Sequence, residues 1–307
     1  MGLPDNQSLF TLVNPQNGNL AFKFVSFEDG RYFDHVQRNN YYSLIWITEG
    51  EGTVKADFAE YAFEKNNLFA FSPYQPFMFS PYQPFMFSAE VIKGTAIYFH
   101  PDFFCIHHHQ TETGCNGVLF NNIYQPHCTY INEISASSLN IIIDQIKNEM
   151  KNRGSALAQH EILISYLKIF LITTSRLKSE QEPETMVAVS DLEKPFILQS
   201  LKEFIEKDFK KKHSPSDYAE ALNISQKALA KITKSYFNKT LTELISERII
   251  IEAKRELYLT KKTIKEIAYE LGYDDEHYFS RFFKTNAEIS PQIYRETVGF
   301  GRDENYQ

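Results

Sequence analysis

A short segment near the C-terminus of this 307-residue chain occurs twice, and this repeat constrains the fold most strongly. The pattern of residues 216–225 (SDYAEALNIS) reappears in residues 265–274 (KEIAYELGYD), at an offset of 49. Past the following turn the offset becomes 50, so that Leu229 matches Phe279. Hydrophobic residues in both copies recur at helical spacing. The repeat therefore predicts two copies of one unit, each with a short helix, a turn and a second helix.

The turn of each copy has a residue that suits a left-handed backbone. Asn223 in the first copy and Gly272 in the second stand where the first helix must stop, and both residue types tolerate that conformation. Each first helix also carries a small residue on its buried face, Ala219 or Ala268, which lets two helices approach closely. This pattern is typical of a helix-turn-helix, which presents its second helix to the major groove of DNA.

A plain helical bundle is the alternative, and it accounts for the apolar residues only. The apolar positions expected to form the core are Tyr218, Leu222, Ile267, Leu271, Phe279 and Phe283. Each second helix also has a polar stripe with neighbours at i, i+1, i+4, i+5 and i+8 or a subset of these. The stripe of the second copy comprises Glu276, His277, Ser280, Arg281 and Lys284, and that of the first comprises Lys227, Ala230, Lys231 and Lys234. Two stripes at matching positions favour nucleic-acid binding over a merely solvated face.

Four short motifs near the C-terminus carry a family resemblance. They are AKREL at 253–257, IKEIAYELGY at 264–273, HYFSRFFK at 277–284 and SPQIYR at 290–295. Together they resemble the C-terminal signature of AraC-type transcriptional regulators, and the match is closer over the second unit than over the first. The resemblance implies an all-α domain in which a long helix, at about Thr242–Leu259, bridges two helix-turn-helix motifs. It also implies that the partner is double-stranded promoter DNA, with both second helices on one side of it.

The resemblance also assigns roles to the polar stripes. Positions that match base-edge contacts are Lys227, Ala230 and Lys231 in the first unit and Glu276, His277, Ser280 and Arg281 in the second. Lys234 and Lys284 fit contacts to phosphate, which position a protein without reading sequence. Ala230 offers only a methyl group and the lysines offer only flexible donors, so we expect the first unit to be the weaker reader.

Several positions depart from the family pattern. The family usually has glycine before the Ser/Thr-Pro turn, where this chain has Asn238 in the first unit and Glu288 in the second. Asparagine takes the left-handed conformation cheaply and glutamate does not, so we expect the Glu288 turn to be built differently. Leu241 replaces the usual proline, and Thr233 stands where the family prefers phenylalanine.

The N-terminal part of the chain shows a different periodicity. Short β-branched and aromatic runs at 20–27, 41–48 and 91–99 alternate with turn-like segments, which is typical of an all-β sandwich or barrel. After residue 133 the period becomes helical and predicts a hairpin of helices at about 136–152 and 157–177. A polar, proline-containing segment then predicts a linker.

The chain is therefore expected to be an α+β protein with two domains, as its length suggests. We expect an N-terminal domain at 1–178, a linker at 179–194 and the all-α domain at 195–300. In architecture alone, the N-terminal domain resembles the cupin-like effector-binding and dimerisation half of the same family, a β-barrel with a helical hairpin. The resemblance implies a homodimeric regulator, an activator by preference, that contacts RNA polymerase and binds a small-molecule effector. The sequence leaves open the effector, the regulated genes and repression as the alternative.

An eight-residue segment, SPYQPFMF, occurs in tandem at 72–79 and 80–87. Two prolines in each copy exclude a central strand. We therefore expect a duplication that is absorbed as a longer loop or an edge segment, and a functional repeat is the alternative. An even number of added residues preserves the side-chain alternation of the strand that follows.

Metal-ligating residue types cluster after the strands and raise the alternative of a cupin-type metalloenzyme with a helical appendage. They are His100, Cys105, His107, His108, His109, Glu112, Cys115, His127 and Cys128. Imidazole, carboxylate and thiolate groups bind metals, but the spacing does not match the metal-cupin signature. Neither a catalytic triad nor a phosphate-binding loop stands out. We therefore expect no metal, no cofactor and no enzymatic activity.

The sequence does not identify an effector site. The candidates for lining a barrel interior are Tyr42, Trp46, Phe71 and Tyr98, although aromatic strand residues are more often core.

The two halves of the chain differ in charge. Residues 1–194 carry 13 basic and 21 acidic residues (net −8), whereas residues 195–307 carry 19 and 18 (net +1). The acidic half would repel phosphate, so only the second half is expected to bind DNA. Without a secretory signal or an apolar run of the ~20 residues that span a bilayer, we expect a cytoplasmic protein.

Overall fold

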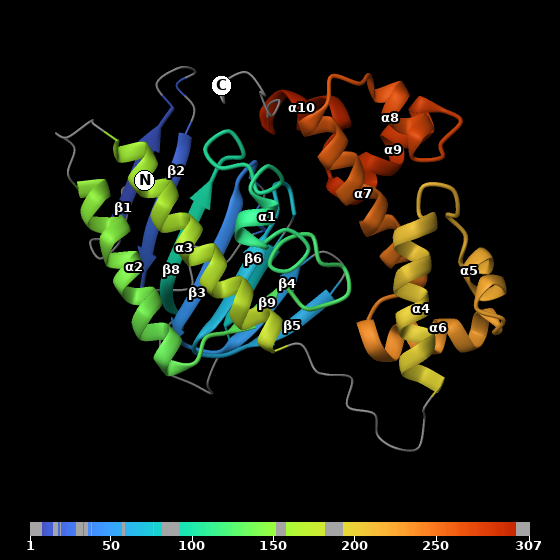
Figure 1. Ribbon diagram of the computed structural model, residues 1–307, viewed down its shortest axis with the longest axis horizontal. Helices are drawn as coiled ribbons and strands as arrows, with labels where there is room; N and C mark the ends of the chain where they lie inside the picture. The colour runs from blue at the N-terminus through green and yellow to red at the C-terminus, as the bar shows by residue number, and fades with distance from the viewer. Residues whose placement is uncertain are drawn as a thin grey trace. The chain divides into compact units, whose positions relative to one another are not determined.

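The chain folds into two compact units in the computed structural model (Figure 1). One unit comprises Met1–Asn122 and Pro126–Glu182, and the other comprises Ile123–Gln125 and Pro183–Gln307. We call them the N-terminal unit and the C-terminal unit. The structure describes residues 8–298 except for 15–17, 19, 29–32, 34–35, 38, 57–58, 76, 82–91, 152–157 and 182–192. The fold is α+β, because the described strands all lie in the N-terminal unit, whereas the elements described in the C-terminal unit are helices.

Two antiparallel sheets form the N-terminal unit. The larger has six strands in the order β1-β2-β8-β3-β6-β9, and the smaller has three in the order β5-β4-β7. The larger sheet comprises β1 (Ser8–Val13), β2 (Leu20–Phe27), β8 (Lys93–Phe99), β3 (Tyr42–Glu49), β6 (Asn67–Phe71) and β9 (Cys128–Tyr130). The smaller comprises β5 (Ala59–Phe63), β4 (Gly52–Ala56) and β7 (Phe77–Pro81). These described strands form two open sheets and no closed barrel, so the expected barrel is not confirmed.

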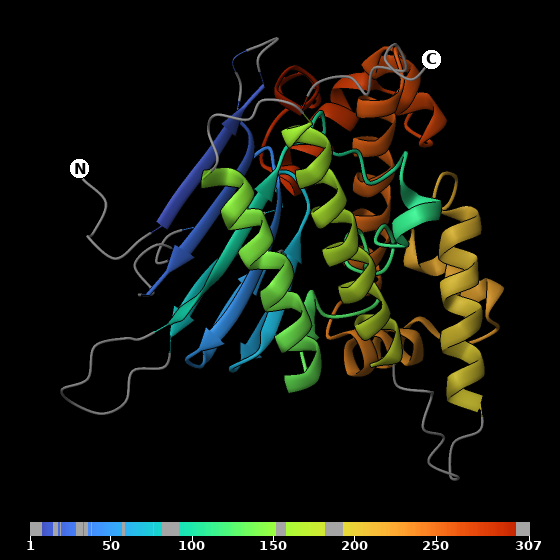
Figure 2. The ribbon, with the colours of Figure 1, turned by 60° about the vertical axis from the view of Figure 1, so that its left-hand side comes forward.

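The larger sheet separates two apolar cores, because successive side chains of a strand point to opposite faces. On β2, Phe22 and Phe24 face the core that includes the helices α2 (Glu133–Lys151) and α3 (Gln159–Glu180). Phe27, on the same strand, packs in the second core, between the two sheets. Figures 1 and 2 both show α2 and α3 side by side across one face of the larger sheet. The short helix α1 (Gln110–Thr113) completes the unit.

Part of the tandem segment forms an edge strand. An edge segment is one of the two placements expected for it, and a longer loop is the other. Among the described strands, β7 pairs with β4, with Phe79 opposite Val54, and so is the last strand of the smaller sheet. Its first residue, Phe77, also exchanges backbone hydrogen bonds with Gln37, which belongs to none of these strands. The rings of Phe71 and Phe77 stack with their centroids 4.1 Å apart. Residues 82–87, which form most of the second copy, lie outside the described residues.

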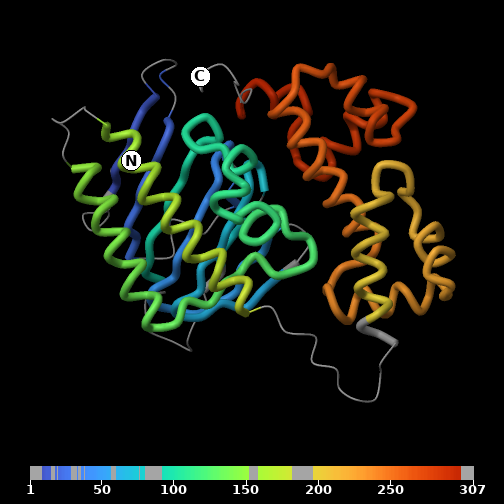
Figure 3. The backbone as a smooth tube through the Cα atoms, viewed as in Figure 1, coloured from blue at the N-terminus to red at the C-terminus, as the bar shows by residue number. Residues whose placement is uncertain are grey.

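The described part of the C-terminal unit contains seven helices. They are α4 (Glu193–Asp208), α5 (Pro215–Ala221), α6 (Gln226–Phe237), α7 (Leu241–Leu259), α8 (Ile264–Glu270), α9 (Glu276–Ala287) and α10 (Pro291–Val298). The tube in Figure 3 shows α7 as the connection between the α5–α6 pair and the α8–α9 pair. Residues 182–192 of the expected linker lie outside the described residues. No described helix is long and apolar enough to span a bilayer.

Candidate nucleic-acid interface

The internal repeat folds into two helix-turn-helix units with the same local construction. α5 and α6 form the first unit, and α8 and α9 form the second. Each first helix begins with a capping box, in which Ser214 pairs with Asp217 and Thr263 pairs with Glu266. Such reciprocal bonds satisfy the free amide groups at a helix start.

The turns of both units use a left-handed residue, as expected. Asn223 has φ +54° and Gly272 has φ +82°. After each turn a side chain caps the second helix: Ser225 accepts from the amide of Ala228, and Asp275 accepts from that of Tyr278. The cap fixes where each second helix begins and therefore which residues lie in its first turn.

Five of the six expected core residues of these units are buried. Tyr218, Ile267, Leu271, Phe279 and Phe283 are each fully enclosed, as are the alanines Ala219 and Ala268 on the buried faces. Leu222 is the exception, because it is half-buried. It is the C-cap residue of α5, as the buried Leu271 is of α8, so its position in the helix does not explain the difference.

The expected polar stripe of the first unit lies on the exposed face of α6. Lys227, Ala230, Lys231 and Lys234 are all exposed. The ammonium group of Lys234 donates to the carbonyl of Asn238 over 3.0 Å, and its other two N–H groups remain able to donate to a phosphate. The stripe lies where a duplex can reach it.

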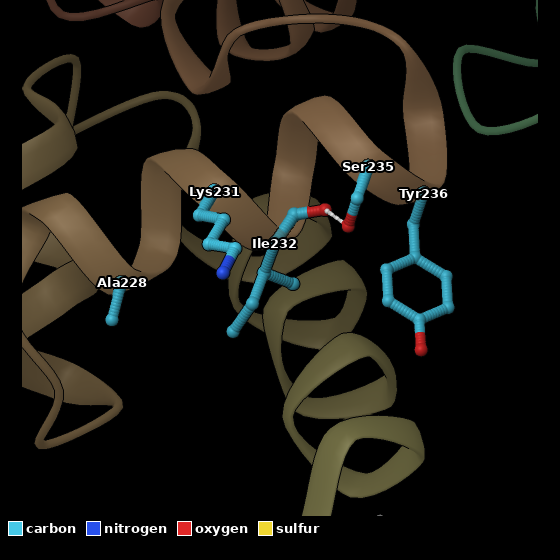
Figure 4. Close-up of a pocket in the computed structure, with 5 residues that line it drawn as sticks. All are labelled: Ala228, Lys231, Ile232, Ser235 and Tyr236. Atoms are coloured by element: carbon cyan, nitrogen blue, oxygen red, sulfur yellow. Dashed lines mark hydrogen bonds between the residues drawn. The ribbon is translucent and has the colours of Figure 1, made fainter.

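A pocket of about 540 Å³ lies beside this stripe and was missed by the sequence reasoning. It is lined by Ala228, Lys231, Ile232, Ser235 and Tyr236, all on α6 (Figure 4). Figure 4 shows the hydroxyl of Ser235 bonded to the carbonyl of Ile232, at 3.1 Å. Lys231 belongs both to the stripe and to the pocket wall. Tyr236 is 53% exposed, which leaves a large aromatic ring accessible next to the stripe.

The polar stripe of the second unit is arranged on α9 in the same way. His277, Arg281 and Lys284 are exposed, and Glu276 and Ser280 are half-buried. Tyr278, which the sequence reasoning did not select, is also exposed at 58%. The N-terminal half of α9 therefore combines basic, acidic, hydroxyl and aromatic side chains. Together they offer both hydrogen-bond donors and acceptors to the edge of a DNA base pair.

An aromatic cluster packs in the second unit where the first unit has aliphatic side chains. The ring of Tyr273 packs on Phe279 and Phe282, with centroids 5.3 Å and 5.2 Å away. Burial raises the pKa of Tyr273. The repeat aligns Tyr273 with Ile224 and Phe282 with Ile232. Ile232, which is smaller than the phenylalanine it aligns with, lines the pocket on α6.

The bridging helix α7 carries two buried carboxylates. Glu252 and Glu256 are 6% and 5% exposed. Glu252 accepts from Arg255 at 2.9 Å and from Lys210, of the α4–α5 connection, at 3.2 Å. Glu256 accepts from Lys262 at 2.8 Å, and Lys262 also reaches Glu270 on α8. Arg255 also donates to Glu256 over 2.6 Å, so one ionic network extends from the α4–α5 connection, across α7, to α8 of the second unit.

This network reverses the effect of burial on Glu252. Burial alone raises the pKa of the carboxyl group, but hydrogen bonds and the charges of Arg255 and Arg248 outweigh it and lower the pKa to about 2. The hydrogen bond to Glu252 also raises the pKa of Arg255. Both groups are therefore held in their charged forms.

The expectation that the Glu288 turn is built differently is wrong. Glu288 has φ +62° and ψ +1°, so it caps α9 in the left-handed conformation. Asn238 caps α6 in the same way, with φ +53°. The packing of the unit therefore imposes the same turn on glutamate, although the conformation costs a residue with a β-carbon about 1–2 kcal/mol.

Replacing Glu288 by glycine is expected to raise the free energy of unfolding by about 1 kcal/mol, because glycine adopts this conformation without a steric cost. The matched control is Asn238→Gly, where the native residue already tolerates the conformation and a change within about 0.5 kcal/mol is expected. Urea denaturation of the full chain measures both. A loss of stability in Glu288→Gly would show that contacts of the Glu288 side chain outweigh the backbone cost.

The aromatic effector candidates of the N-terminal unit lie on opposite faces of the larger sheet. Tyr42 and Trp46 belong to the core beneath α2 and α3, whereas Phe71 and Tyr98 belong to the core between the two sheets. All four are at most 5% exposed. The structure does not bring them together, and their role in effector binding stays a prediction.

The metal-ligating residue types of the N-terminal unit pair with other groups. Glu112 accepts from Lys168 over 2.6 Å, and His109 lies 3.2 Å from the same carboxylate. His127 contacts the amide of Gln75 at 2.9 Å. Among the residues that the structure describes, no three His, Cys, Asp or Glu side chains form a group that could hold a metal ion.

Similar proteins are regulators of transcription. A family model described as a helix-turn-helix domain matches residues 218–297. The regulatory protein SoxS of Salmonella typhimurium is 30% identical over 102 residues, which cover 33% of this chain and 95% of SoxS. The transcriptional activator RhaS of Enterobacter sp. is 23% identical over 214 residues, which cover 69% of this chain and 70% of RhaS.

Other similarities are partial or distant. The raffinose operon transcriptional regulatory protein RafR of Pediococcus pentosaceus is 30% identical over 83 residues. That match covers 27% of this chain and spans only 30% of the length of RafR. Among solved structures, ToxT from Vibrio cholerae O395 is 17% identical, with 95% of this chain and 97% of ToxT covered and a TM-score of 0.39.

Proposed function

This chain belongs to the AraC-type family of transcriptional regulators, and on that premise we propose that it binds promoter DNA sequence-specifically through both helix-turn-helix units. The observation that carries the proposal is the pair of polar stripes, which lie on exposed faces of α6 and α9 at equivalent positions of the repeat. A helix-turn-helix inserts its second helix into the major groove, where each base pair presents a distinct pattern of donors and acceptors.

Each side chain of the polar stripe on α9 receives a role from its chemistry. Arg281 is shaped for a bidentate contact with guanine, and Glu276 can accept from the amino group of cytosine. His277 and Ser280 provide further hydrogen bonds to base edges. Lys284, one turn further along, contacts phosphate.

On α6, lysines dominate the reading face. Lys227 and Lys231 donate to base edges, Ala230 contacts a thymine methyl group, and Lys234 contacts phosphate. None of these side chains accepts a hydrogen bond. The first unit therefore distinguishes fewer base pairs than the second.

Selection of binding sites from random DNA by the full chain is expected to yield a two-part site, with the parts about one helical turn or 10 bp apart. The part under α9 should be the more strictly specified. Lys231→Ala, as a control, should change the preference in the weaker part only. Equal information in the two parts, or more under α6, would contradict the asymmetry. Failure to enrich any sequence would contradict the proposed function itself.

For the rest of the chain we propose the organisation of an effector-regulated activator. Residues 1–178 would form a cupin-like effector-binding and dimerisation domain, 179–194 a linker and 195–300 the DNA-binding domain. The relative RhaS is named a transcriptional activator, which supports activation and contact with RNA polymerase. The relatives described above are regulators, which favours regulation over the metalloenzyme alternative. A protein that acts on promoters works in the cytoplasm.

Exposed isoleucines on the helical hairpin support a homodimer. Ile134 and Ile141 are 84% and 63% exposed on α2, and Ile169 is 49% exposed on α3. Ile134 and Ile141 are seven residues apart and so share one face of α2. A two-fold contact between copies of the hairpin would remove these side chains from water and would be self-complementary.

Sedimentation of the full chain at about 30 μM is expected to show a dimer, because even a micromolar dissociation constant, ~8 kcal/mol, suffices there. Lysine at both Ile134 and Ile141 should give monomers, since two charges would be buried at the contact. Ile293→Lys is the matched control, because Ile293 on α10 is similarly exposed at 47%. A wild-type monomer at that concentration would refute the proposed interface.

A further inference from the structure

We propose that Gly272 locks the second helix-turn-helix unit onto the first, so that the chain recognises one separation of its two half-sites and rejects others. The contact joins the turn of the second unit, Gly272 and Tyr273, to the connection between α4 and α5, Lys210–His213. The inference rests on the proposed function and adds to it the residue that sets the separation of the two DNA-contacting helices, α6 and α9.

Gly272 makes the closest part of this contact. A β-carbon at this position would lie 2.2 Å from the carbonyl oxygen of Lys210 and 3.2 Å from the Cε1 atom of His213. The first neighbour is backbone, which cannot rotate away as a flexible side chain would. Any residue other than glycine must therefore push the turn of the second unit away from the α4–α5 connection.

The aromatic cluster connects this contact to α9, the second helix of the unit. The ring of His213 packs on that of Tyr273, with centroids 4.9 Å apart. Tyr273 in turn packs on Phe279 and Phe282 of α9. The position of α9 is therefore fixed against the α4–α5 connection.

The same connection is tied to the first unit and to the bridging helix. The hydroxyl of Tyr218, on α5, donates to the carbonyl of Lys212 over 2.9 Å. The ammonium group of Lys210 reaches Glu252 on α7. Both units and the helix between them thus meet around residues 210–213, which leaves little freedom for one reader to move relative to the other.

The repeat itself shows that backbone conformation alone does not require glycine at this turn. Asn223 occupies the equivalent position of the first unit and also has a positive φ, of +54°. It is exposed. Asparagine at 272 would therefore suit the turn but not the space against Lys210, and this separates the locking role of Gly272 from its conformational role.

A rigid link affects DNA recognition through the effective concentration of the second reader. Two modules bind best when their fixed separation matches that of their sites. Each base pair inserted between half-sites moves one of them by roughly 3.4 Å and rotates it by about 35°. A locked pair of readers cannot follow both changes, whereas a pair joined only through α7 can follow them in part by bending.

The experiment measures binding of the full chain to its selected site and to variants with one base pair inserted or deleted between the half-sites. Fluorescence anisotropy of labelled duplexes is read for wild type, Gly272→Asn and Asn223→Gly. Wild type should lose about tenfold or more in affinity with either altered spacing. Gly272→Asn should bind the original site less tightly and lose less than about threefold on the altered ones. Asn223→Gly should discriminate like wild type.

The outcomes separate this inference from the proposed function. If wild type binds its site specifically but tolerates both altered spacings, the lock is refuted and the function stands. If wild type selects no site, the function fails. Thermal unfolding reports whether Gly272→Asn folds; if it does not, His213→Ala removes the ring contact without adding atoms and should also relax discrimination. Wild-type discrimination by both folded variants would overturn the role of the contact.

Discussion

Alanine at Arg281 is expected to weaken binding to the selected site by about 1–3 kcal/mol and to relax the preference at one base pair. Arg281 is exposed in the N-terminal half of α9, where a guanidinium group can donate two parallel hydrogen bonds to guanine. Alanine removes both donors and leaves the helix intact, because it has the best helix propensity. Competition binding with all four bases at each position measures the change.

Lys284→Ala is the matched comparison, since Lys284 lies on the same exposed stripe. It should weaken binding to every sequence alike and lower the slope of log affinity against log salt by about one. If Arg281→Ala instead behaved like Lys284→Ala, with preferences intact, the arginine would be a phosphate contact. Unchanged affinity would show that this face of α9 does not meet DNA.

Alanine at Glu252 is expected to lower the free energy of unfolding of the C-terminal unit by about 3 kcal/mol, near the lower limit for breaking a buried ion pair. The carboxylate is 6% exposed and is shared by Arg248, Arg255 and Lys210. Its removal leaves three cations close together without their common acceptor. The estimate is at the lower limit because the side chains of Arg255 and Lys210 are 38% and 39% exposed and can reach water.

The stability that Glu252 contributes should also depend on pH. Its pKa is about 2 in the folded chain against an ordinary value of 4.5. A lowered folded pKa stabilises the protein above the unfolded value, and this contribution is lost as the pH falls from 4.5 toward 2. Urea denaturation at pH 7 and pH 3 is therefore expected to show a smaller difference between wild type and Glu252→Ala at the lower pH.

The control for this prediction is Glu220→Ala on α5, because Glu220 is exposed. Its stability should stay within about 0.5 kcal/mol of wild type at pH 7. If Glu252→Ala were as stable as this control, the free-energy cost of burying the carboxylate would equal the stabilisation from its ion pairs.

Local rules account for much of the C-terminal unit. The repeat placed both turns at Asn223 and Gly272, and the expected long helix at Thr242–Leu259 begins one residue earlier as α7. These features depend on residues close together in the chain, so periodicity and capping reveal them. Glu288 shows the limit of the approach, because packing overrides the preference of a single residue.

Other features depend on residues distant in sequence and could not be read from it. The contact of Gly272 with Lys210 arises only when the helices pack. In the N-terminal unit, β-branched and aromatic runs between turn-like segments located the strands β2, β3 and β8. Such runs carry no information about the order of strands in the sheet or about closure into a barrel. The register that pairs Ser43 with Tyr98 places Tyr98 on the face opposite to Trp46.

The edge position of β7 has a consequence for how the chain acquired its duplicated octet. Deleting residues 72–79 or 80–87 would give the same polypeptide, with Ser-Pro-Tyr-Gln-Pro-Phe-Met-Phe still following Phe71. The strand would keep its first four residues, and the connection from β7 to β8 would shrink from eleven residues to three. Closing the longer connection costs only about 1 kcal/mol more in chain entropy. A replication error of eight codons could therefore persist here, where one between two central strands would break the sheet.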